Sequence, residues 1–166
     1  MFALKPISRD SLDGALAKAE RYRLLNEPTE AASICRDILD VAPANREARV
    51  SLILALTDEF PRDDRAFSSA VAEVAVLESD YDRAYYSGIA WERRAKAFHD
   101  AGRPGSSGHV YDWIVKALGL FEEAERLRPV GNDDPILRWN ACVRFLERHK
   151  TVGPKMEDVK EPILSE

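Results

Sequence analysis

The chain contains few of the residues on which a covalent or metal-based framework depends. Its 166 residues include two cysteines, Cys35 and Cys142, and three histidines. The cysteines lie far apart, each within an apolar helical pattern, which argues against a disulfide framework. The histidines, His99, His109 and His149, have no second ligand at the three- or four-residue spacing of a helical metal site. We therefore expect neither a metal site nor a cofactor.

Long apolar runs and an excess of basic residues are also missing. The longest apolar run, residues 50–56, contains one serine and falls well below the ~18 residues that a membrane-spanning helix needs. The first ten residues lack the basic start and apolar stretch of a secretory leader. The net charge of −5 argues against nucleic acid, because that affinity requires clustered Lys and Arg. We expect a cytoplasmic protein that binds neither membrane nor nucleic acid.

No recognisable catalytic motif occurs in the chain. Nucleophile elbows, nucleotide-binding loops and paired redox cysteines are all missing. Adjacent acidic residues at 63–64, 122–123 and 133–134 lie near expected helix starts or on polar faces, where negative charge suits the helix dipole or faces water. We therefore expect a protein that is not an enzyme.

A helix-packing pattern does occur, twice and with the same spacing. A small residue is followed by an apolar residue four positions later, another core residue three further on, and a proline five beyond that. Such a block describes an amphipathic helix that packs closely and ends at a fixed point. A matching partial pattern lies upstream of each block. The first copy consists of Ala15, Ala19, Tyr22, Ala31, Cys35, Ile38 and Pro43, and the second of Trp91, Ala95, Phe98, Ala117, Phe121, Ala124 and Pro129.

Together these residues resemble the tetratricopeptide repeat, in which an aromatic and small-residue first helix pairs with a second helix that carries alanine, phenylalanine, alanine and a final proline. The resemblance implies an all-α fold, a right-handed superhelix of antiparallel helical hairpins. We expect about seven helices and roughly three repeats, the middle one degenerate, within one domain over residues 1–149. The resemblance also implies a non-enzymatic scaffold or adaptor that binds a protein or peptide.

The pattern predicts helices over residues 11–25, 29–41, 45–60, 82–101, 109–128 and 134–149, with a fourth helix that ends near Ser79. The third helix is apolar on nearly every side, which places it centrally in the stack. Because Ile53 stands where the repeat has a small residue and no terminal proline follows, we expect the middle hairpin to be splayed or longer. About ten residues are added between Phe98 and Ala117 relative to the first copy, as loop and extra helix.

Residues 150–166 lack helical periodicity and form a tail without an independent fold. Two prolines, Pro154 and Pro162, favour an extended conformation there. We expect this tail to lie along the protein surface, anchored by Val159, Ile163 and Leu164.

The candidate binding residues form three stripes beside the closely packed alanines. In the tetratricopeptide family this surface of the first helices lines a concave groove for peptides. The carboxylate-clamping version of that groove uses lysine and asparagine, and the stripes do not reproduce it. Their mixed charge and apolar centre suit an amphipathic peptide; the alternative is that they are ordinary surface and core residues. The stripes are Leu16, Glu20 and Arg23, then Val50, Leu54 and Thr57, then Glu92, Lys96 and His99.

Two further features leave other functions open. Tyr111 and Trp113 lie in the added part of the sixth helix, where they either extend the core or form an exposed patch. In the second case the chain is an oligomerisation or assembly module with weak self-association. The glycine-rich loop 102–108 leads into a helix with Arg103 nearby, but it lacks the Lys and Ser or Thr of a phosphate-binding loop. A small-ligand or enzymatic role for that loop has the least support.

Overall fold

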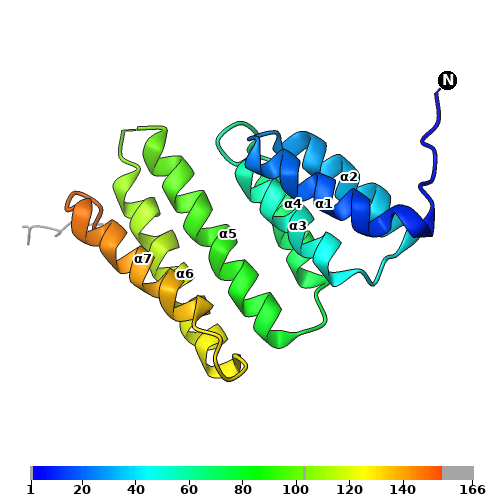
Figure 1. Cartoon of the computed structure of the whole chain (residues 1–166). Helices are drawn as coiled ribbons and strands as arrows, with labels where there is room; N and C mark the ends of the chain where they lie inside the picture. The colour runs from blue at the N-terminus through cyan, green and yellow to red at the C-terminus, as the bar shows by residue number, and fades with distance from the viewer. Residues whose placement is uncertain (1, 103, 155–166) are drawn as a thin grey trace, which may run out of the picture.

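The chain folds as helices that run back and forth in sequence order (Figure 1). The computed structural model describes residues 2–102 and 104–154, and over these residues it contains seven α-helices, one short 3-10 turn and no strand. The anchoring residues expected in the tail, Val159, Ile163 and Leu164, lie outside the described residues. The helices are α1 (Leu12–Leu24), α2 (Pro28–Val41), α3 (Arg46–Asp58), α4 (Ala66–Ala75), α5 (Asp80–Asp100), α6 (Ser107–Leu127) and α7 (Asp134–Arg148), with the 3-10 turn at Arg9–Ser11.

Local chemistry explains where several helices begin. Asn45 accepts a hydrogen bond from the Ala48 backbone N–H at the start of α3. Ser79 does the same for Asp82 at the start of α5. Side-chain oxygens at these positions satisfy N–H groups that have no partner inside the helix. Helices α2 and α7 carry proline in the first turn, where its missing N–H costs nothing.

The fourth helix is shorter than the sequence analysis predicts. It ends at Ala75 rather than near Ser79, and the backbone N–H groups of Val76 and Leu77 bond to the carbonyls of Glu73 and Val74 in a tightened last turn. Ser79 serves as the cap of α5, so it belongs to the next helix. The middle hairpin is therefore not longer than its neighbours, because its second helix has only 10 residues.

The inserted residues lengthen the hairpin of α5 and α6. Each of these helices has 21 residues, whereas the other five have between 10 and 15. The turn between them contains Gly102 and Gly105, whose φ angles of 62° and 75° lie in the region that favours glycine. The prediction of added loop and added helix is confirmed, although α6 begins at Ser107 and takes in part of the expected loop.

Each helix packs against the helices before and after it in the chain. The substantial contacts between helices two apart all join odd-numbered ones: α1 with α3, α3 with α5, and α5 with α7. Figure 1 shows α5 between the group α1–α4 and the pair α6–α7. We call the set α1, α3, α5 and α7 the odd-helix layer. It is this layer that carries the stripes predicted to bind a ligand.

The predicted central position of α3 is confirmed by burial. Leu52, Ile53 and Ala55 are all buried, and α3 contacts α1, α2, α4 and α5. Ala19 and Ala95, expected at close helix contacts, have no exposed surface. Their small side chains allow neighbouring helices to approach closely.

Gly88 marks the closest approach between α5 and α6. A Cβ atom added at Gly88 would lie 2.5 Å from Cε1 of Phe121, a side chain that is itself fully buried. Gly119, in the middle of α6, has no atom within 4 Å of the same added position. Packing therefore requires glycine at position 88, whereas Gly119 has no packing role and only weakens α6.

Alanine substitutions at these two glycines should change stability in opposite directions. Gly88→Ala forces Phe121 out of its position and should lower the free energy of unfolding by ~1 to 3 kcal/mol. Gly119→Ala removes backbone freedom from the unfolded chain and should raise it by ~0.5 to 1 kcal/mol. Urea denaturation followed by circular dichroism measures both. Equal effects of the two substitutions would contradict the close packing of α5 on α6.

Candidate functional site

An open cleft lies where three odd-numbered helices meet. Arg23 of α1, Thr57 of α3 and Lys96 of α5 all line it, and its volume is about 420 Å³. These are three of the nine residues predicted to bind a ligand, one from each stripe. We call this space the cleft. The remaining lining residues are Leu24, Asn26, Asp58, Pro61, Arg93, Ala97 and Asp100.

Four of the other predicted residues lie elsewhere on the odd-helix layer. Leu16 is half-buried and Glu20 is exposed, both on α1. Val50 and Leu54 are half-buried and pack against apolar clusters that involve α4 and α5. None of the four is among the residues that line the cleft. The apolar centre predicted for the groove thus belongs largely to helix packing.

Thr57 and Glu92 are buried, in contrast to the solvent-facing position that the stripes predict. The Thr57 hydroxyl donates to the Leu54 carbonyl at 2.7 Å and accepts from Arg93, also at 2.7 Å. Glu92 has a side chain only 1% exposed. Both are polar groups beneath the surface whose hydrogen bonds orient the cations above them. Glu92 therefore acts on a ligand only through its neighbours.

Asp58, at the end of α3, joins three helices. Its Oδ2 atom accepts from Arg23 Nε at 2.9 Å, and its Oδ1 atom accepts from Arg93 of α5. Burial lowers the pKa of the Arg93 guanidinium, and the charge of Asp58 partly restores it. One carboxylate thus holds two guanidinium groups at the edge of the cleft.

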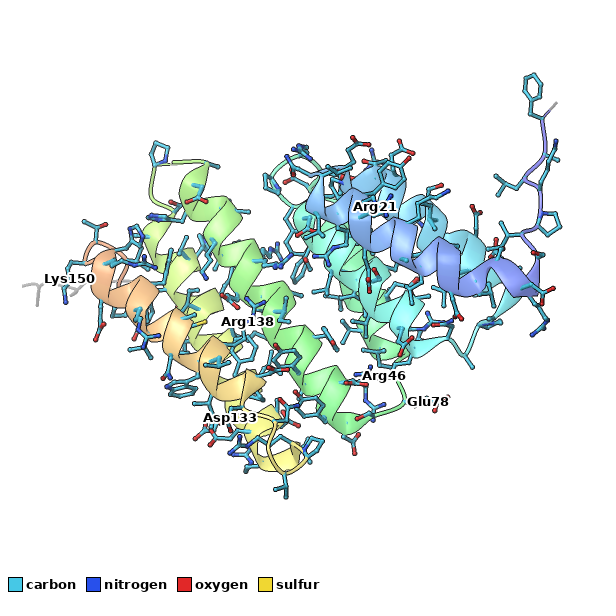
Figure 2. The ribbon with its side chains drawn as sticks, in the orientation of Figure 1. Arg21, Arg46, Glu78, Asp133, Arg138 and Lys150 are labelled. Atoms are coloured by element: carbon cyan, nitrogen blue, oxygen red, sulfur yellow. The ribbon has the colours of Figure 1, made fainter. Side chains whose placement is uncertain are left out.

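The Glu92 carboxylate likewise faces two cations, one from α5 and one from α7. Its Oε1 atom lies 2.5 Å from Lys96 Nζ, and its Oε2 atom lies 3.5 Å from Arg138 Nη1. Figure 2 shows Arg138 in the space between α7 and α5. Burial lowers the pKa of Arg138, whereas the charge of Glu92 and a hydrogen bond with Tyr85 raise it. The two raising effects together are larger, so the net shift of the pKa is upward.

A third carboxylate ties α3 to α5 at the opposite end of these helices. Asp82, whose side chain is 3% exposed, accepts two hydrogen bonds of 2.6 Å from Arg46. Figure 2 labels Arg46, the first residue of α3. Successive members of the odd-helix layer are therefore all connected by guanidinium–carboxylate pairs. We call these pairs the ionic ties: Arg23–Asp58, Arg93–Asp58, Arg46–Asp82 and Arg138–Glu92.

The cleft carries a local excess of positive charge, although the whole chain has a net charge of −5. Its lining contains three cations, Arg23, Arg93 and Lys96, and two carboxylates, Asp58 and Asp100. The Glu92 carboxylate beneath Lys96 also faces the Arg138 guanidinium, so the excess of positive charge remains when both are counted. Asp58 is shared by two guanidinium groups, which retain N–H donors beyond those it accepts. A ligand with a carboxylate or another anionic group fits this arrangement.

His99 does not line the cleft but packs against α7. Its ring lies 4.4 Å from that of His149 and 5.3 Å from that of Phe145, centroid to centroid. The sequence shows these histidines far apart, and the parallel course of α5 and α7 brings their C-terminal ends together. Within residues 2–102 and 104–154, no group of three or more His, Cys, Asp or Glu side chains is placed to hold a metal ion.

Tyr111 and Trp113 are both half-buried and pack against the apolar cluster of α5–α7. Trp113 makes an edge contact with Phe98 at 5.1 Å between ring centroids. This packing favours the interpretation that they extend the core. In the loop expected over 102–108, Arg103 lies outside the described residues and Gly108 is buried within α6.

The sequence analysis did not predict five residues of the ionic ties: Asp58, Arg93, Arg138, Arg46 and Asp82. A signal for the first two exists, because Arg23, Asp58 and Arg93 follow one another at intervals of 35 residues. Residues of opposite charge at a constant interval along the chain are candidates for a tie between neighbouring odd-numbered helices. Glu92 and Arg138 are 46 residues apart, since the insertion between α5 and α6 separates them.

The burial of Glu92 generates a stability prediction. The Lys96→Gln, Arg138→Gln double variant leaves the Glu92 carboxylate buried without a cation, and should lower the free energy of unfolding by ~3 to 5 kcal/mol. Lys96→Gln alone should cost much less, because Arg138 still faces Glu92. Adding Glu92→Gln to the double variant should recover most of the loss in a urea titration. Failure of this rescue would contradict the pairing.

The function of the cleft is inferred from its own residues. Comparisons of the chain with protein-family models, with curated proteins and with solved structures find no match. Over the described residues, no helix is both long and apolar enough to cross a membrane. The cations of the cleft, their hydrogen-bond donors and the helices that hold them are the basis for a functional proposal.

Proposed function

We propose that the chain is a non-enzymatic scaffold that binds an acidic segment of a partner protein in the cleft. The observation that carries this proposal is the meeting of Arg23, Thr57 and Lys96, from three successive odd-numbered helices, in one open space. Residues from separate helices converge there on a surface, which is how repeat proteins form extended binding faces. The scaffold works by holding a segment of its partner, without chemistry of its own.

Helical hairpins of the tetratricopeptide type, arranged in a right-handed superhelix, are part of the proposal. Two features support them. The interval of 35 residues between Arg23, Asp58 and Arg93 is close to the ~34-residue length of that repeat. The contacts among α1, α3, α5 and α7 are those expected if these helices lie on the inner side of a curve, where neighbouring repeats are closest.

The chemistry of the cleft selects an acidic segment as the ligand. Arginine donors in a fixed fork suit a carboxylate, and Lys96 adds a mobile ammonium group. A volume of about 420 Å³, open to solvent, accommodates a few side chains. We place the protein in the cytoplasm, where its two buried cysteines stay reduced.

Removal of two cleft cations tests the proposal. Lys96→Glu is unsuitable, because it would place a second carboxylate against buried Glu92. In the Arg23→Gln, Lys96→Gln variant, each carboxylate keeps one cation: Arg93 for Asp58 and Arg138 for Glu92. Peptides selected from a random 12-residue display library on the native protein should bind this variant about tenfold more weakly, or ~1.4 kcal/mol.

The matched control removes two exposed cations outside the cleft, in a Lys18→Gln, Arg126→Gln variant. It should bind the selected peptides as the native protein does. Binding to the native protein should also weaken as salt is raised, since the cleft charges are partly exposed. A library that yields no acidic peptide, or equal binding by the two variants, would contradict the proposal.

A further inference from the structure

A second pocket adjoins the cleft, and its chemistry is the opposite. Its volume is about 280 Å³, and two carboxylates, those of Asp63 and Asp64, lie on its exposed rim. Four of the other eight lining residues are aromatic, and Arg94 is the one cation among them. We call it the aromatic pocket. Its aromatic residues are Phe60, Phe67, Phe98 and Trp113.

The aromatic pocket already accommodates a cation. The guanidinium carbon of Arg94 lies 4.0 Å from the ring centroid of Phe67 and 4.4 Å from that of Trp113. Aromatic faces attract cations through their negative quadrupole, and nearby carboxylates add to that attraction. The charge of Asp64 acts on Arg94, and Asp63 lies 3.8 Å from Nε of Arg65, whose side chain is 96% exposed. Because such an exposed ion pair is weak, a cation contributed by a ligand can take the place of Arg65.

The cleft and the aromatic pocket share a wall formed by Pro61 and Ala97. On α5 the adjacent residues Arg93 and Arg94 line the cleft and the aromatic pocket respectively. Successive residues on a helix point about 100° apart, and the two spaces flank a helix of ~10 Å diameter. A segment in the polyproline II conformation has three residues per turn and rises ~3.1 Å per residue, so side chains three residues apart point the same way and span about this distance.

We infer that the partner segment is dipolar: an acidic side chain enters the cleft, and a Lys or Arg side chain three residues away enters the aromatic pocket. This inference rests on the proposed function and adds the second half of the ligand. The acidic group meets Arg23 and Lys96, and the basic group meets the carboxylates of Asp63 and Asp64 beside the aromatic wall. The shared ridge of Pro61 and Ala97 lies under the residues between them.

Four synthetic 12-residue peptides on one neutral background test the inference. They carry Glu and Arg three residues apart, Glu alone, Arg alone, or neither, each with a fluorescent label for anisotropy titrations. We expect the peptide with both charges to bind at least about tenfold more tightly than the peptide with Glu alone. Because Trp113 lines the aromatic pocket, only peptides with Arg should change the tryptophan emission.

Variants of the rim assign the effect to the aromatic pocket. Asp63→Asn, Asp64→Asn should reduce binding of the two-charge peptide to the level of the Glu peptide, and leave the Glu peptide unaffected. Both side chains are exposed, and asparagine keeps an oxygen to accept the Arg65 N–H that Asp63 now accepts. The control, Glu122→Gln, Glu123→Gln, removes two exposed carboxylates on α6 and should change nothing.

The outcomes separate the two proposals. Equal binding of the Glu peptide and the two-charge peptide would overturn the dipolar ligand and leave the acidic segment in place. Loss of the Arg advantage in the Glu122→Gln, Glu123→Gln variant as well would also overturn it, since the effect would then be general charge. If neither Glu-containing peptide binds, both the dipolar ligand and the proposed function fall.

Discussion

The ionic ties determine how the odd-helix layer is built. Apolar residues of α1, α3 and α5, among them Ala19, Leu52 and Ala90, belong to one buried cluster, which holds these helices together in the interior. Guanidinium–carboxylate pairs such as Arg23–Asp58 and Arg93–Asp58 hold the helices through long side chains and leave polar surface exposed between them. Burying a carboxylate such as Glu92 is costly on its own, and two cations around it offset that cost.

Packing within the hairpins and pairing between them therefore serve different ends. Small residues such as Gly88 and Ala95 let helices of a hairpin approach closely and exclude water. Packing of α2 on α3 and of α4 on α5 joins successive hairpins, and the ties add polar links between their odd-numbered helices. Because Asp58 and Glu92 keep part of their cations at the surface, the contacts that hold the layer together also supply the charge of the cleft. Structure and proposed function thus rest on the same side chains.

Local patterns predicted the helices, whereas the ion pairs between odd-numbered helices were harder to predict. Prolines, caps and apolar spacing placed seven helices, and the stripes placed Arg23, Thr57 and Lys96 in one cleft. Each stripe describes one helix at a time and therefore could not predict that Glu92 is buried beneath Lys96. The burial of Glu92 depends on Arg138, which lies 46 residues away in the sequence, beyond an insertion. The early end of α4 was missed because Ser79 caps the following helix.

The central claim is that the odd-helix layer is the ligand surface of this chain. Backbone amide shifts, recorded by nuclear magnetic resonance while an acidic 12-residue peptide is titrated, test it most directly. We expect the largest changes in amide shift on the residues of α1, α3 and α5 that line the cleft, near Arg23, Asp58 and Lys96. Changes that cluster instead on the outer surfaces of α2, α4 and α6 would contradict it.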